Sequence, residues 1–173
     1  MERYPLRRLK LRSGEEHREP LTLEVEPFVV GGLDYVVRPS RVEAELAVQR
    51  AMGGDIFRLR FPAALEGPCM RCLGAAQFTL QLDGTEVHDG ARNAPVELRS
   101  DYVEGDDLLV GAWARDLVGT GLPDRVLCRP DCEGLCVGCG LPLEAGAHDH
   151  GEVPADARWG ALAALRDASP DGV

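Results

Sequence analysis

The sequence contains no long apolar segment and few aromatic residues. No run approaches the ~20 consecutive apolar residues that a transmembrane helix requires, and the mean hydropathy is −0.16. Charges occur throughout the first twelve residues, MERYPLRRLKLR, whereas a secretory signal needs an apolar stretch. We therefore expect a cytoplasmic protein that contacts no membrane. Aromatic residues make up 5% of the chain, so its core must be packed mainly with Leu, Val and Ala.

Positive charge is scarce and unevenly distributed. The chain has 19 basic and 29 acidic residues, a net charge of −10. Six basic and three acidic side chains give residues 1–18 a net charge of +3, and the other 13 basic and 26 acidic residues give −13. This charge argues against a broad nucleic-acid-binding face, because phosphate contacts require Lys and Arg. The pattern predicts a basic N-terminal arm, residues 1–18, before an acidic body that attracts basic partners.

Apolar residues alternate with polar ones through the middle of the chain, which predicts β-strands that have one buried face. The strongest strand segments are VEAELAVQ (42–49), DIFRLRF (55–61) and QFTLQLDG (77–84). LDYVVRP (33–39) and PVELRS (95–100) are weaker candidates. The Gly53-Gly54 pair predicts a hairpin turn. We expect a twisted antiparallel sheet of about four to six strands, either open or closed into a barrel.

Two segments have helical periodicity instead. In GDDLLVGAWARDLVGTGLP (105–123), Leu109, Trp113 and Leu117 recur every four residues, and Asp106 and Asp107 predict an N-terminal cap. PADARWGALAALRDA (154–168) predicts a C-terminal helix. The expected fold is α+β, with a basic arm (1–18), a mainly antiparallel β region with one helix (19–125), and a Cys/His segment that ends in a helix (126–173).

Six cysteines are the strongest chemical signal in the chain. Two Cys-x-x-Cys units, PCMRCLG (68–74) and GLCVGCG (134–140), flank Cys128 and Cys132. In a reducing compartment, such clusters indicate metal binding or thiol redox chemistry rather than disulfides. Each unit ends in glycine soon after its second cysteine, as a zinc knuckle requires for a turn with positive φ. A thioredoxin-like pair would instead lie at a helix N-terminus, whereas Cys72 precedes a predicted strand.

Two histidines follow the cysteines in the sequence HDH, at His148 and His150. Six cysteines and two histidines make eight ligands, enough for two tetrahedral zinc sites. In the preferred partition, one zinc binds Cys69, Cys72, Cys128 and Cys132, and a second binds Cys136, Cys139, His148 and His150. A crossed partition would join the two Cys-x-x-Cys units and leave Cys128 and Cys132 with the histidines. The sequence therefore predicts one or two zinc ions.

No recognisable catalytic motif accompanies the predicted metal sites. The chain has no H-E-x-x-H, P-loop or nucleotide-binding fingerprint, and no zinc-deaminase pattern. Four protein ligands on each zinc leave no open coordination position, which a catalytic zinc requires. A non-enzymatic protein with structural zinc is the leading interpretation. The alternative is a thiol-based redox or metal-responsive regulatory protein, in which residues 132–139 exchange zinc for disulfides.

The order of these motifs resembles one known family. The chain reads CMRCL, then a helix and LP, then C-x-x-x-C-x-GLC-x-x-CG, and then DARWGALAAL. Over residues 60–167 it resembles the YceD family of large ribosomal RNA subunit accumulation proteins. All six cysteines fall on the family's cysteine positions, and Trp159 falls on a motif usually written DPRW. The chain departs from the family at HDH, where a C-x-C is common, and at LPLE, where N-L-N is common.

The resemblance implies a non-enzymatic factor in ribosome biogenesis that supports accumulation of large-subunit ribosomal RNA. The expected partner is a basic ribosomal protein or a large-subunit assembly intermediate, and no small-molecule substrate is expected. Contact with ribosomal RNA is expected through the basic side chains of the N-terminal arm, namely Arg3, Arg7, Arg8, Lys10 and Arg12.

Overall fold

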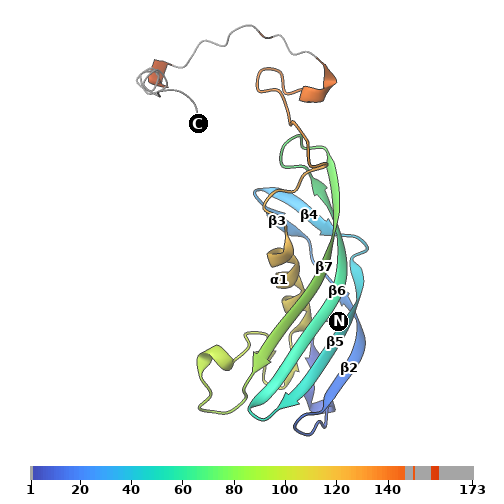
Figure 1. Cartoon of the computed structure of the whole chain (residues 1–173), viewed down its shortest axis with the longest axis vertical. Helices are drawn as coiled ribbons and strands as arrows, with labels where there is room; N and C mark the ends of the chain where they lie inside the picture. Colours follow the sequence, from blue (N-terminus) through green and yellow to red (C-terminus); the bar gives the residue numbers. More distant parts are fainter. Residues whose placement is uncertain (1, 147–149, 151–156, 160–173) are drawn as a thin grey trace, which may run out of the picture. The chain divides into compact units, whose positions relative to one another are not determined.

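A computed structural model describes residues 2–146, 150 and 157–159. The chain divides into two units, Met1–Cys132 and Glu133–Val173, and each is considered separately below. The first unit combines antiparallel sheets with one α-helix (Figure 1), as expected for the α+β class. Among the described residues, no helix is long and apolar enough to cross a membrane.

The main sheet of the first unit has six strands, all antiparallel to their neighbours. Along the chain these are β2 (Glu16–Glu24), β3 (Phe28–Val30), β4 (Leu33–Val37), β5 (Arg41–Ala51), β6 (Gly54–Pro68) and β7 (Ala75–His88). The long strand β6 pairs with β7 along one edge. Along its other edge it pairs with β5 through residues 54–60 and with β4 through residues 65–66.

The sheet is open rather than closed into a barrel. β2 pairs with β5 alone and β7 pairs with β6 alone, so in the described part of the chain both strands are sheet edges. The alternative prediction of a closed barrel is therefore wrong. Closure would need a ladder between β2 and β7, but α1 packs against β7 and β2 within the curve of the sheet.

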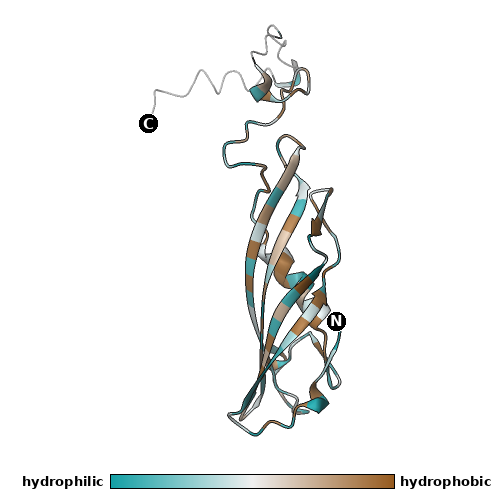
Figure 2. Cartoon of the chain, turned by 90° about the vertical axis from the view of Figure 1, so that its right-hand side faces the viewer, coloured by the Kyte–Doolittle hydropathy of each residue, from teal (hydrophilic) through white to brown (hydrophobic). Residues whose placement is uncertain are grey.

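The strands form where apolar residues alternate, and the three strongest segments are confirmed. Along β6, Phe57, Leu59 and Phe61 are buried, while Arg58 and Arg60 lie on the opposite face. Figure 2 shows this alternation as brown and teal bands along the strands. The hairpin turn is confirmed too, since Ala51 pairs directly with Gly54.

Helix α1 (Val110–Gly121) covers the buried face of the sheet with Trp113, Ala114 and Val118. Glycine on β7 lets the helix approach closely: a Cβ atom at Gly84 would lie 2.5 Å from Cδ2 of Leu117. The helix therefore packs against β7 at a point that has no room for a side chain.

The start of α1 differs from the sequence prediction. Asp106 and Asp107 do not cap the helix, because Asp107 belongs to strand β9 (Asp107–Leu108) and Leu109 holds the N-cap position without a side-chain bond. Strand β9 lies between β1 (Tyr4–Pro5) and β8 (Val103–Glu104) in a second, three-stranded sheet. The two aspartates instead pair with basic residues near the N-terminus, Asp106 with Arg7 and Asp107 with Arg3.

The weak strand prediction for residues 95–100 is wrong. This segment forms a 3-10 helix, η2 (Val96–Leu98), and its Leu98 carbonyl accepts a hydrogen bond from Asp89 N–H at 2.6 Å. Pro95 starts the turn, because proline has no N–H with which to join a ladder. A second short 3-10 helix, η1 (Leu6–Arg8), follows β1.

The second unit has little regular structure in its described part. A β-bridge joins Leu135 to Pro142, and two short 3-10 helices follow, η3 (Leu143–Ala145) and η4 (Ala157–Trp159). Of the C-terminal helix predicted at 154–168, only residues 157–159 are described, and the rest lies outside the described residues. Trp159, in η4, is 64% exposed.

Candidate metal centres

The first Cys-x-x-Cys unit forms the tight turn that joins β6 to β7. Cys69 N–H donates to the Gly74 carbonyl at 2.7 Å, and Leu73 N–H donates back to the Cys69 carbonyl at 2.9 Å. Inside the turn, Arg71 N–H points at the Cys69 sulfur, 3.4 Å away. These bonds turn both cysteine side chains toward one point, as a zinc knuckle does.

The second Cys-x-x-Cys unit repeats the same backbone pattern within the second unit of the chain. Cys136 N–H donates to the Leu141 carbonyl at 2.8 Å, and Gly140 N–H donates to the Cys136 carbonyl at 2.8 Å. Each bond has the same residue spacing as its counterpart in the first turn. The two turns, residues 69–74 and 136–141, are therefore one local structure built twice, and they are called the first and second knuckles below.

Both knuckles need one residue with positive φ, but the residue type differs. In the second knuckle this residue is Gly140, with φ of 72°, as predicted. In the first knuckle it is Leu73, with φ of 58°, and the predicted glycine, Gly74, lies one residue later, just before β7. The prediction was wrong there because the strained residue directly follows the second cysteine. A non-glycine residue costs roughly 1–2 kcal/mol in this conformation.

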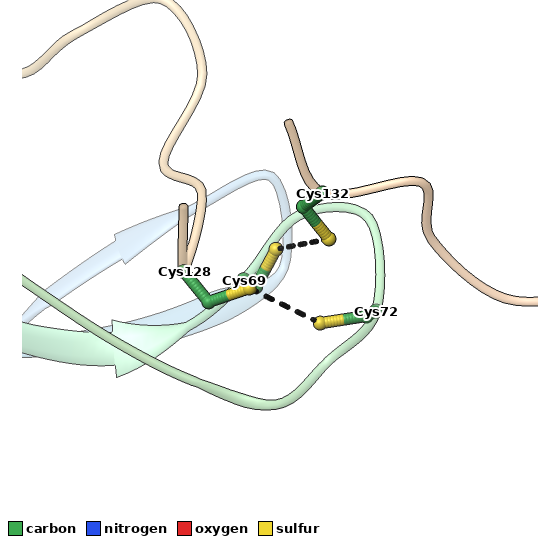
Figure 3. A group of neighbouring side chains, drawn as sticks. All are labelled: Cys69, Cys72, Cys128 and Cys132. Atoms are coloured by element: carbon green, nitrogen blue, oxygen red, sulfur yellow. Dashed lines mark hydrogen bonds between the residues drawn. The ribbon is translucent and has the colours of Figure 1, made fainter. Parts of the chain in front are cut away.

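The chain after α1 brings two more sulfurs to the first knuckle. Met70 N–H donates to the Val126 carbonyl at 2.9 Å, which fixes the following segment beside the turn. Figure 3 shows the resulting group of four sulfurs, contributed by Cys69, Cys72, Cys128 and Cys132. The Cys69 and Cys132 sulfurs lie 3.7 Å apart, those of Cys72 and Cys128 lie 3.6 Å apart, and all four lie within 4.8 Å of one another.

These separations suit a tetrahedral metal ion. Zinc–sulfur bonds of about 2.3 Å in a regular tetrahedron place neighbouring sulfurs about 3.8 Å apart, and the two closest pairs lie near that value. A disulfide would need sulfurs near 2.05 Å, so neither pair is bonded, and all six cysteines are free. The cluster could therefore hold a metal ion.

The protonation of the four thiols also fits a cation at their centre. Burial raises the pKa of Cys69, but the N–H groups of Cys72, Arg71 and Cys128 outweigh burial and lower that pKa to about 6. Burial raises the pKa of Cys128 to about 12, together with hydrogen bonds from neighbouring cysteine sulfurs and the charge of Cys132. The protein alone thus favours the thiolate at Cys69 and opposes it at Cys128. A divalent cation would remove that opposition, because coordination deprotonates thiols.

Several residues that the motif did not indicate support this cluster. Arg71 Nη1 donates to the Cys132 carbonyl at 2.6 Å, joining the first knuckle to the segment after α1. The Tyr35 hydroxyl donates to the Pro68 carbonyl at 2.9 Å, and its ring packs where a Cβ atom at Gly67 would lie 2.1 Å away. No sequence signal marks Arg71 or Tyr35, because their partners are backbone atoms. The one sequence feature that allows the close approach of the Tyr35 ring is Gly67, just before the motif.

The second cluster contains Cys136, Cys139 and His150, whose ligand atoms lie within 4.8 Å of one another. Two N–H groups, of Gly138 and Cys139, point at the Cys136 sulfur and lower its pKa. Cys139 and His150 are exposed, unlike the buried Cys69 and Cys132 of the first cluster. The predicted fourth ligand, His148, lies outside the described residues. Three ligand groups are therefore in place for a metal ion.

The described geometry groups the cysteines as in the preferred partition. Cys128 and Cys132 lie with the first knuckle, and His150 lies with the second. The crossed partition would separate Cys128 and Cys132 from the first knuckle, whereas their sulfurs lie with those of Cys69 and Cys72. Which ion binds, and whether His148 completes the second set, stay predictions.

The fold and the two cysteine clusters together define the class of protein. It is a mixed α/β protein with two cysteine-rich candidate metal centres, one of which lies at the end of the main sheet. The chain belongs to the YceD family, whose model, described as large ribosomal RNA subunit accumulation protein YceD, matches residues 57–166. The matched region is more than half of the chain and contains all six cysteines. The family's description names a role in ribosomal RNA accumulation and no reaction.

Similar proteins occur in mycobacteria. Uncharacterized proteins of Mycobacterium tuberculosis and Mycobacterium bovis are each 29% identical to this chain over 135 residues, which cover 75% of it. The same alignment spans 64% of the length of those relatives. No solved structure matches the chain.

Proposed function

We propose that this protein is a non-enzymatic, zinc-binding factor of ribosome biogenesis that supports accumulation of large-subunit ribosomal RNA. The family match over residues 57–166 carries this proposal. It covers β6, β7, α1 and both knuckles, which are the parts that build the candidate metal centres. The region that matches the family therefore contains the residues proposed to bind zinc.

Zinc is the proposed ion at both centres. Four sulfurs at tetrahedral spacing suit zinc, which prefers thiolate and imidazole ligands. The first centre would take Cys69, Cys72, Cys128 and Cys132, and the second would take Cys136, Cys139, His150 and His148. Four protein ligands leave no position for water, so such a zinc contributes folding energy rather than catalysis.

Depletion of the protein tests its role in the cell. We expect large-subunit ribosomal RNA to fall relative to small-subunit ribosomal RNA, and expression of the wild-type chain to restore the ratio. The variant Cys69→Ser should fail to restore it if the first zinc centre supports the active fold. An unchanged ratio after depletion would contradict the proposed role.

The proposed RNA contact involves a subset of the basic arm. Arg3 pairs with Glu104 at 2.7 Å and Arg7 pairs with Asp106, so both arginines already form salt bridges within the protein. The other three basic residues, Arg8, Lys10 and Arg12, are exposed and have no salt-bridge partner among the residues that the structure describes. We propose that these three contact ribosomal RNA phosphates.

Charge substitution tests this contact better than deletion, because deletion would remove Tyr4, which is 1% exposed. Replacing Arg8, Lys10 and Arg12 together by Ala should flatten the dependence of log RNA affinity on log salt by about 0.7 per lost contact. Replacing Arg3 and Arg7 by Ala is the matched control and should change the slope less. Equal slopes for wild type and the triple variant would exclude these residues as phosphate contacts.

A basic ribosomal protein is the proposed protein partner. The chain carries a net charge of −10, and opposite charge accelerates and orients the association of proteins. Capture of purified large-subunit proteins by the immobilised chain tests this partner. Binding should weaken as salt rises, because screening shortens the range of charge attraction.

The thiol-redox alternative has weaker support from the structure. It concerns residues 132–139. Cys132 is fully buried and Cys136 is buried too, whereas reactive cysteines are accessible; of the three cysteines in this segment, Cys139 alone is exposed. Peroxide treatment separates the two functions. Rapid zinc release with disulfide formation would support the redox function, and retained zinc would support the structural one.

A further inference from the structure

The two long edge strands of the main sheet, β2 and β7, differ in how their outer backbone is protected. An unpaired strand edge presents N–H and C=O groups that can pair with another chain. Natural proteins block such edges with proline or charged side chains. On β2 and β7, some backbone N–H and C=O groups bond to the neighbouring strand and the others face outward. The register of the sheet and the hydrogen bonds just beyond the strand ends identify the outward groups.

On β7, the odd-numbered residues present their N–H and C=O groups outward. The ladder with β6 pairs Pro68 with Ala75, and one step further Cys69 N–H bonds to the Gly74 carbonyl at 2.7 Å. In antiparallel ladders, bonded and non-bonded pairs alternate, so odd residues of β6 bond to even residues of β7. Beyond β7, Asp89 N–H bonds away from β6, to Leu98, which agrees with this assignment.

On β2, the same reasoning places even-numbered residues outward. Arg50 N–H bonds to the Glu15 carbonyl at 3.0 Å, one step beyond the pair Glu16–Gln49. The outward position 20 is then a proline, which has no N–H to offer to an added strand. Three of the other outward positions are charged, namely Glu16, Arg18 and Glu24. The edge at β2 is therefore blocked.

The edge at β7 has almost none of this protection. Its outward positions contain no proline and no lysine, and Asp83 alone is charged; they are Ala75, Gln77, Thr79, Gln81, Asp83, Thr85 and Val87. Within the described part of the chain, no hydrogen bond reaches the outward backbone groups of these residues. A stretch of more than ten residues is thus open to strand addition.

The side chains beside this edge indicate what an added strand would carry. Phe78 and Leu80 are only partly buried, so an apolar side chain could cover them. Strand β7 contains no Lys or Arg. Asp83 is already paired with Arg58 at 2.6 Å, but Glu86 lies with two further carboxylates around Tyr102, those of Asp116 and Asp101. The Tyr102 pKa is raised by burial, by its hydrogen bond to Asp116 and by the charges of these three carboxylates. The surroundings of the edge are therefore apolar at one end and acidic at the other.

We propose that the free edge of β7 binds an extended segment of a basic partner protein as an additional strand of the sheet. The segment would carry apolar side chains beside Phe78 and Leu80 and Lys or Arg side chains beside Glu86, and its backbone would bond to the outward groups of β7. This inference rests on the proposed function, since it specifies how the basic partner docks. A second copy of this chain is a poorer occupant, because two β7 edges would bring like charges together on a protein of net charge −10.

The test uses a peptide probe and two proline variants of the full chain. The probe is a peptide about eight residues long, to match a strand, with valine residues in one half and lysine residues in the other. Thr79→Pro removes one outward N–H from β7 and leaves its bonds to β6 in place. Thr22→Pro is the matched control, because Thr22 is also an exposed threonine at an outward position, on the edge that Pro20 already blocks.

Thr79→Pro should weaken binding of the probe by about tenfold, since it removes a backbone hydrogen bond and obstructs the edge. Thr22→Pro should bind like wild type, and circular dichroism should show both variants folded. In wild type, the probe should slow hydrogen exchange at the amides of Thr79 and Gln81. If Thr79→Pro is unfolded, Gln81→Pro replaces it.

Equal binding by Thr79→Pro and wild type would overturn the edge proposal. If Thr79→Pro also retained the basic ribosomal partner, the proposed function would stand and that partner would dock elsewhere. Loss of a wild-type dimer in Thr79→Pro, measured by sedimentation, would show that a second copy occupies the edge, which also overturns the proposal.

Discussion

The two knuckles have the same backbone hydrogen bonds in different surroundings. Cys69 and Cys132 of the first centre are fully buried beside the core of the sheet, whereas Cys139 and His150 of the second centre are exposed. The first knuckle also receives the Arg71 and Tyr35 contacts. In the second knuckle the position that corresponds to Arg71 is Gly138, which offers no side chain.

This difference teaches that the Cys-x-x-Cys pattern specifies a turn, and the fold around it determines what the turn stabilises. In the first centre, a metal ion would join the β6–β7 turn to the segment after α1, and so would close the end of the sheet. In the second centre, a metal ion would order a unit in which few of the described residues are buried. The first ion should therefore stabilise the main fold, and the second should stabilise its own loop.

The largest expected effect is a loss of stability in one unit alone. Cys72→Ser should lower the free energy of unfolding of the first unit by on the order of 5 kcal/mol, a large part of the ~10 kcal/mol of a structural zinc site. Cys139→Ser should leave that unit unchanged. Limited proteolysis should then cut residues 119–131 sooner in Cys72→Ser only. Equal digestion of both variants would show that the two centres are equivalent.

The order of metal loss gives a second test. A chelator should remove the ion of the second centre first, because Cys139 and His150 are exposed, whereas the first centre has two buried ligands, two half-buried ligands and no exposed one. A zinc indicator should report two phases, and Cys139→Ser should lack the fast phase. A single phase in wild type would contradict the difference in burial.

A smaller effect should come from exchanging residues at the positive-φ position of each knuckle. Gly140→Leu forces a leucine into that conformation and should weaken metal binding at the second centre by about tenfold, given a strain of roughly 1–2 kcal/mol. Leu73→Gly relieves the strain but adds chain entropy, and should stabilise the first unit by about 0.5 kcal/mol. Thermal unfolding and chelator competition measure both. Destabilisation by Leu73→Gly would mean that the leucine side chain contributes packing of its own.

The smallest expected effect is the loss of one supporting hydrogen bond. Arg71→Ala removes the bond from Nη1 to the Cys132 carbonyl and should lower the free energy of unfolding by about 1 kcal/mol. The control is Val137→Ala in the second knuckle, since Val137 is fully exposed and should change stability by less than about 0.5 kcal/mol. Equal changes in the free energy of unfolding for the two variants would show that the Arg71 hydrogen bond makes no net contribution to stability.

The sheet and the cysteine turns could be predicted from the sequence because both depend on local patterns. Alternation in residues such as Phe57 and Leu59 reflects one buried face, and the knuckle is a turn of six residues. The pairing of β1 with β9 could not be predicted, because Tyr4 and Leu108 meet from distant parts of the chain. For the same reason, Asp106 and Asp107 resembled a helix cap although their partners, Arg7 and Arg3, lie about a hundred residues away.

Zinc content is the most direct measurement of the central claim, that both cysteine clusters are closed structural metal centres. Elemental analysis of the purified chain after gel filtration should give two zinc ions per chain, falling to one in Cys139→Ser. One ion in the wild type would contradict the second centre and remove His148 and His150 from the ligands. A chain that folds with no metal would contradict both.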